Sequence, residues 1–114
     1  MDIAGLLRGV YDVYEKMYIY RSLFVYDDGN YETMLKIRGC LQKDDHSICY
    51  LNDNVEKDVI NSRRVYFIHV NDLHSLEQRC DADSISIIFS IGKYVHDKTT
   101  KTLGEKKLIF NISV

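Results

Sequence analysis

Apolar side chains recur at a helical period through the first twenty residues. At about 100° per residue they share one face, which is made by Ile3, Leu6, Val10, Val13, Tyr14 and Met17. Leu7, Tyr11 and Tyr18 widen this face on one side, and charged residues lie opposite. Because the carboxylate of Asp2 can accept a hydrogen bond from the first turn, we expect an amphipathic helix from Asp2 to about Tyr20.

The rest of the chain is dominated by alternating apolar and polar positions, the period of a half-buried strand. Such segments cover residues 22–26, 31–41, 47–51, 84–95 and 107–114. Val65–Val70 is apolar enough to be a central strand that is covered on both faces. Asp28-Gly29 is a hairpin-turn signal between the first two segments, and Asp72 can cap a short helix over residues 73–80.

These elements predict one α+β domain spanning residues 1–114. We expect the N-terminal amphipathic helix to pack on a curved antiparallel sheet of about five or six strands, because short loops favour antiparallel neighbours. The last two strands would form a long hairpin around the charged loop 96–104. The alternative is a small β-barrel with an N-terminal helix.

Composition adds an expectation about compartment. The chain has 114 residues, a net charge of −2, no proline and no tryptophan, and its N-terminus lacks the pattern of a signal peptide. Cys40, Cys49 and Cys80 make an odd number without the spacing of a metal site, which is typical of thiols in a reducing compartment. We therefore expect an intracellular protein, cytoplasmic or nuclear. Abundant Ile, Lys, Asn and Tyr indicate an AT-rich genome, so a viral or phage accessory factor is one hypothesis.

No segment carries a recognisable catalytic or cofactor motif. His69 and His74 lack the close pairing of zinc ligands, and neither Cys40 nor Cys49 has a base beside it in sequence that would activate a thiolate. The aspartate pairs lie in predicted turns, where aspartate is favoured by its hydrogen bonds to nearby backbone. We expect no enzymatic activity, no metal and no cofactor.

Two segments are candidate contact surfaces. The wide margin of the first helix predicts a protein interface made by Leu7, Tyr11, Tyr14 and Tyr18, because tyrosine is enriched at interfaces. The last hairpin gathers cationic side chains that could contact an anion or a nucleic acid, namely Lys93, Lys98, Lys101, Lys106 and Lys107. The same lysines could instead keep the hairpin solvated and protect a sheet edge.

The leading hypothesis is a non-enzymatic module that binds another protein, either a foreign partner or a second copy in a homodimer. Its contacts would be the flank of the first helix and the edge of the last strand. The alternative is a small protein that binds RNA or single-stranded nucleic acid through the basic hairpin at residues 93–107. We expect no membrane contact.

Overall fold

The computed structural model describes residues 21–43, 47–52, 59–60, 63–104 and 107–113. The predicted first helix, residues 2–20, lies outside the described residues. The strands are β1 (Arg21–Tyr26), β2 (Ile48–Tyr50), β3 (Val65–His69), β4 (Ile85–Ile91) and β5 (Leu108–Ile112). The α-helices are α3 (Tyr31–Lys43), α5 (Leu76–Arg79) and α6 (Lys93–Leu103). Short 3-10 helices cover η1 (Asp28–Asn30), η2 (Val70–Ser75) and η3 (Ala82–Ser84).

The five strands form one parallel sheet in the order β2-β3-β1-β4-β5. The predictions of an antiparallel sheet, of a β-barrel and of a hairpin between the last two strands are therefore wrong. Parallel neighbours need a crossover long enough to return the chain to the starting end of the sheet. α3 lies in the crossover from β1 to β2, and α6 makes the crossover from β4 to β5.

α3 replaces the strand that was predicted over residues 31–41. Its buried side chains are Thr33, Met34, Ile37 and Leu41, a helical spacing that also leaves Tyr31 exposed. The expected turn at Asp28-Gly29 is instead the start of the helical segment. The carboxylate of Asp27 accepts a hydrogen bond from the backbone N–H of Asn30 at 2.9 Å, which is the role of an N-cap residue.

α6 replaces the predicted charged loop and also residues 93–95 of the strand that was predicted over residues 84–95. Glycines with positive φ flank it, Gly92 at 94° and Gly104 at 69°, a conformation that side chains with a Cβ rarely adopt. The backbone N–H of Gly104 bonds the carbonyl of Thr100 and closes the last turn. Val95 and Thr99, one turn apart, are fully buried, so one narrow stripe holds the helix on the sheet.

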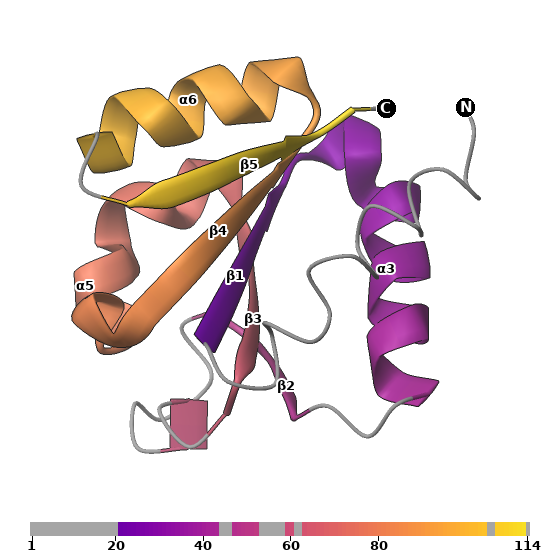
Figure 1. Cartoon of the computed structure of the whole chain (residues 1–114), viewed down its shortest axis with the longest axis horizontal. Coiled ribbons are helices and arrows are strands. Elements are labelled where there is room, and N and C mark those ends of the chain that lie inside the picture. Colours follow the sequence, from indigo (N-terminus) through magenta and orange to yellow (C-terminus); the bar gives the residue numbers. More distant parts are fainter. Residues whose placement is uncertain (1–20, 44–46, 53–58, 61–62, 105–106, 114) are drawn as a thin grey trace.

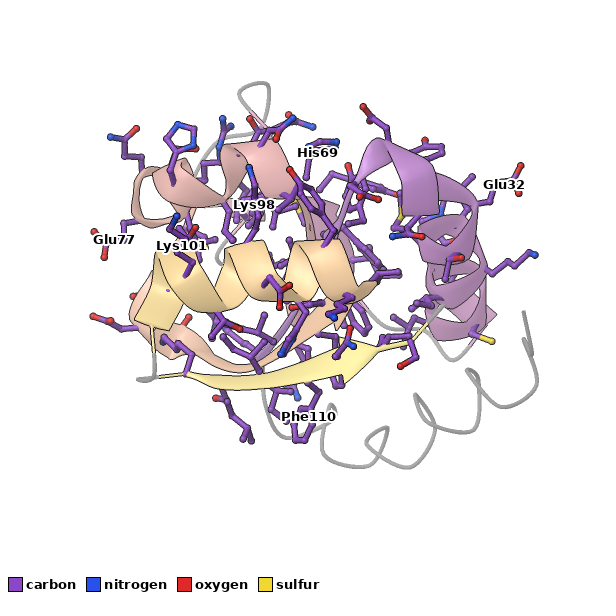
Figure 2. All side chains as sticks on the ribbon, turned by 90° about the horizontal axis from the view of Figure 1, so that it is seen from above. Glu32, His69, Glu77, Lys98, Lys101 and Phe110 are labelled. Carbon is purple, nitrogen blue, oxygen red and sulfur yellow. The ribbon has the colours of Figure 1, made fainter. Side chains whose placement is uncertain are left out.

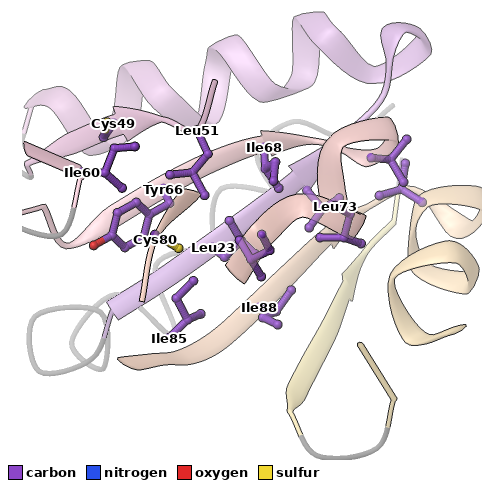
Figure 3. Packing of buried hydrophobic residues seen from close by; sticks show 14 residues of the cluster. Leu23, Cys49, Leu51, Ile60, Tyr66, Ile68, Leu73, Cys80, Ile85 and Ile88 are labelled. Atoms are coloured by element: carbon purple, nitrogen blue, oxygen red, sulfur yellow. The ribbon is translucent and has the colours of Figure 1, made fainter. Parts of the chain in front are cut away.

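The two faces of the sheet carry separate cores. The connection from β1 to β2 crosses the sheet in the opposite direction to the others, and right-handed crossovers then place α3 opposite α5 and α6 (Figure 1). On the α5–α6 side, Leu23, Ile68 and Ile88 from three adjacent strands pack with Leu73 of η2 (Figure 3). On the α3 side, Met34, Ile37 and Leu41 cover a core of aromatic and aliphatic strand residues.

Several local predictions are confirmed. Strands overlap the predicted segments at residues 22–26, 47–51, 65–70, 84–95 and 107–114. β3 is an interior strand, as its apolar run predicts, and η2 with α5 covers the predicted short helix at residues 73–80. The prediction of a small domain that combines helices with a sheet is also confirmed. Among the described residues, no helix has the length and hydropathy needed to cross a membrane.

Candidate interaction surface

β5 forms one edge of the sheet and exposes large apolar side chains. Leu108 is 57% exposed and Phe110 is 40% exposed, whereas Ile112 at the end of the strand is buried. All three alternate onto the α3 side of the sheet, and Phe110 projects away from α6 (Figure 2). Contiguous apolar side chains left on a surface are typical of contact sites.

Phe110 is also the last member of a row of rings that crosses the whole sheet. Paired positions on the five strands place Tyr50, Phe67, Phe24, Phe89 and Phe110 side by side in that order. Successive ring centroids lie 5.6, 5.2, 4.8 and 5.8 Å apart. Phe67, Phe24 and Phe89 have a ring of the row on each side, whereas the row ends at Tyr50 on one edge strand and at Phe110 on the other.

The backbone of β5 offers hydrogen-bonding groups at the same edge. The N–H of Gly92 bonds the carbonyl of Ile112 at 2.9 Å, so Ile112 directs its backbone groups at β4. Because successive residues of a strand direct these groups to opposite sides, Phe110 also faces β4, whereas Ile109 and Asn111 face outward. Among the residues that the structure describes, β5 therefore ends the sheet, and its outward donors and acceptors face no further strand, so another strand can bind them.

Charge does not protect this edge. Natural edge strands are commonly guarded by lysine, but Leu108–Ile112 contains no charged residue. The nearest described cation, Lys107, is tied back: its Nζ donates to the carbonyls of Ala82 at 2.8 Å and Ile85 at 3.1 Å. The edge is thus compatible with a close approach by a second apolar strand.

The predicted basic hairpin does not exist in this form. Lys93, Lys98 and Lys101 lie on the exposed face of α6, and Nζ of Lys98 lies 5.4 Å from the ring centre of Tyr94. Lys107 is bound to backbone at the start of β4, and Lys106 lies outside the described residues. The described lysines of this segment are therefore divided between the exposed face of α6 and a half-buried contact with backbone carbonyls.

The carboxyl ends of the strands are where parallel sheets usually bind ligands, at the point where neighbouring connections leave to opposite faces. That point lies between β1 and β4, whose chains continue to α3 and α6. Here the side-chain amide of Asn30 donates to the carbonyl of Ile91 at 2.9 Å. This bond joins the loop after β1 to the end of β4, so the side chain of Asn30 lies where a ligand would bind.

His69 ends β3 beside this point, and both of its ring nitrogens have partners. Nδ1 accepts a hydrogen bond from the N–H of Asn71 at 3.1 Å, which places the proton of the neutral ring on Nε2. Nε2 then donates to Oδ1 of Asp28 at 3.0 Å. The ring packs edge-on against Tyr26, whose pKa is raised mainly by burial. This arrangement fixes two loops and leaves no free imidazole nitrogen for base catalysis.

An acidic cavity of about 280 Å³ lies at the other end of the sheet, before β4. Its lining residues are Glu77, Cys80, Asp81, Ala82 and Asp83. Within the described part of the chain, no group of three or more histidine, cysteine, aspartate or glutamate residues has a geometry that could hold a metal ion. The cavity therefore carries acidic charge without a described coordination site.

The cysteines are free thiols. Cys40 lies on α3 and not on the predicted strand, whereas Cys49 lies on β2 as predicted. Burial raises the pKa of the Cys49 thiol, and this effect exceeds the opposing effect of nearby Arg63. Cys49 is thus a core side chain that stays protonated at neutral pH.

The predicted interface residues Leu7, Tyr11, Tyr14 and Tyr18 lie outside the described residues. The surface at β5 was only partly anticipated. The sequence predicted the edge of the last strand as a contact, but it assigned the apolar face of residues 107–114 to the core. No family model, curated protein or solved structure matches the chain.

Proposed function

We propose that this chain is a non-enzymatic protein-interaction module whose contact site is the free edge of β5. The observation that carries the proposal is the exposure of Leu108 and Phe110 on an uncharged edge strand. Strand addition uses such an edge, because backbone hydrogen bonds give affinity and alternate side chains give specificity. Outward-facing Ile109 and Asn111 supply the backbone groups, and Leu108 and Phe110 supply the apolar contact.

The nucleic-acid alternative loses its basis in the corrected fold. It required a long cationic hairpin, but the described lysines of residues 93–107 lie on α6 or are tied to backbone. The contact residues predicted on the first helix remain a separate hypothesis. The β5 edge now carries the proposal for the part of the chain that the structure describes.

The proposal includes the cellular compartment and the origin that the sequence predicts for this module. Three free thiols suit a reducing intracellular compartment, the cytoplasm or the nucleus. The AT-rich codon signature supports an origin in a virus or phage, in which the module would modulate a host protein or bind a second copy of itself.

A proline at Asn111 tests the proposal. Its N–H faces outward, so proline removes a donor from the free edge without removing a bond to β4, a position where strands tolerate proline. In pull-downs from an extract of the native host, we expect Asn111→Pro to recover roughly tenfold less bound protein, the effect of losing about one hydrogen bond together with close contact.

Asn111→Ala is the matched control, because it shortens the side chain and keeps the N–H. It should bind as wild type does, and thermal unfolding should show that both variants remain folded. Equal recovery by the proline variant and wild type would remove the β5 edge as the contact site.

A further inference from the structure

We infer that the partner of β5 is a second copy of this chain, paired edge to edge about a two-fold axis. The inference rests on the proposed function and names its partner. Two copies of one strand related by a two-fold axis perpendicular to the sheet must run antiparallel, and the axis brings the same faces of both sheets together. The result is one continuous ten-stranded sheet.

The register follows from which residues face outward and from the greatest overlap of the two strands. In an antiparallel ladder, outward-facing residues exchange hydrogen bonds in pairs, and the residues between them lie opposite each other without such bonds. Ile109 and Asn111 face outward on β5, so each can exchange hydrogen bonds with either of these residues in the second copy. Pairing Ile109 with Asn111 is the symmetric register in which all five residues of both strands overlap. Phe110 then lies opposite itself on the axis, and Leu108 lies opposite Ile112.

This register continues the row of rings. Phe110 ends the row in one copy, with its ring 5.8 Å from that of Phe89. The two-fold axis sets the Phe110 rings of both copies side by side on the α3 face, so the five rings of each copy become one row of ten. Aromatic pairs directly opposite each other in non-hydrogen-bonded positions are a favourable cross-strand contact.

The β5 strands of the two copies are also compatible in charge and in apolar character. The paired segments contain no charged residue, so the symmetric arrangement opposes no like charges within Leu108–Ile112. Leu108, Phe110 and Ile112 from each copy gather on one face and cover the side chains that are exposed in the single chain. A single pair of five-residue strands is small beside the roughly 1,200–2,000 Å² of a stable interface, so we expect a dimer that dissociates on dilution.

Disulfide trapping tests both the partner and the register. With Phe110→Cys, the two introduced thiols lie at a non-hydrogen-bonded pair with Cα atoms about 4.5 Å apart, within the range of a disulfide. With Leu108→Cys, the two copies are offset by four residues, about 13 Å, which exceeds that range. Leu108 is the more exposed of the two positions. If exposure alone decided the result, Leu108→Cys would therefore be trapped more readily than Phe110→Cys.

We expect mild oxidation of the full chain to convert most of Phe110→Cys to a covalent dimer. Leu108→Cys should stay within the low background of wild type, whose Cys49 and Cys80 are buried and whose Cys40 is half-buried. Sedimentation equilibrium of wild type should show a mass that rises with concentration towards two chains. A wild type that is monomeric at every concentration overturns the inference, as does equal trapping of the two variants.

The result separates this inference from the proposed function. If Phe110→Cys is not trapped but Asn111→Pro loses a protein from host extract, the edge binds a foreign chain and the second copy is wrong. If the edge amides are protected in dilute monomer, another part of the same chain occupies the edge, and both proposals fail.

Discussion

Replacing Phe24 with alanine should lower the free energy of unfolding by about 3–5 kcal/mol, the range for removing a large aromatic ring from a core. Phe24 is fully buried on the central strand. Its ring stacks on Phe67 at 5.2 Å on one side and on Phe89 at 4.8 Å on the other. Alanine leaves a cavity between two strands that cannot approach each other, since their spacing is fixed by the ladder of β1. Urea unfolding followed by circular dichroism measures the change.

Phe110→Ala is the matched control, because it removes the same ring from the same row at the free edge. Phe110 has one ring neighbour and is partly exposed, so its loss should cost about 1 kcal/mol in dilute protein, in line with the smaller burial. Equal costs for the two variants would contradict the order of strands, which places β1 at the centre and β5 at the edge.

Replacing Met34 with alanine should lower the free energy of unfolding by about 2–5 kcal/mol. Met34 is fully buried on α3, and its sulfur accepts a hydrogen bond from the hydroxyl of Tyr50 at 3.8 Å. This substitution separates the helix from the strand predicted over residues 31–41. An alternating strand with Thr33, Leu35 and Ile37 inward would direct Met34 outward, where alanine would cost little.

Lys36→Ala is the control for this helix, because Lys36 is exposed on α3. It should change the free energy of unfolding by less than about 0.5 kcal/mol. If Met34→Ala is equally mild in urea unfolding, α3 does not pack on the sheet through the face that the structure assigns to it.

The sequence predicted the positions of all five strands but added a sixth at residues 31–41, and it predicted the wrong direction of pairing. Val65–His69 and Ile85–Ile91 are apolar runs whose burial is visible from composition alone. α3 was missed because Tyr31, Thr33, Leu35 and Ile37 alternate as a strand does, although Met34 and Leu41 complete a helical stripe. Once α3 is taken as a strand, the chain has no crossover after β1, and an antiparallel sheet follows.

α6 was missed for a different reason. Its buried stripe is narrow, with Val95 and Thr99 fully buried and the lysines outside, so its composition is that of a solvated loop. The two glycines with positive φ that bound the helix, Gly92 and Gly104, were the available signal. Gly104 was instead assigned to a hairpin loop, which joined β4 and β5 in the wrong direction.

The candidate surface depends on contacts between strands that are far apart in the sequence, and no pattern within one segment can predict them. Alternation predicted that Leu108, Phe110 and Ile112 share a face, but the exposure of that face follows from the position of β5 at the edge. The row of rings joins residues from five separate strands, and its register is fixed only when all the crossovers are in place. The sequence therefore predicted the edge of the last strand as a contact, but not the apolar side chains that it exposes.

Amide hydrogen exchange along β5, followed by NMR, tests the central claim most directly. The N–H groups of Phe110 and Ile112 face β4 and should be protected at every protein concentration. The N–H groups of Ile109 and Asn111 face outward, so they should exchange freely in dilute protein and gain protection as the concentration rises. Outward amides that are equally protected in dilute and concentrated protein would contradict a free edge at β5, because their partner would then lie within the same chain.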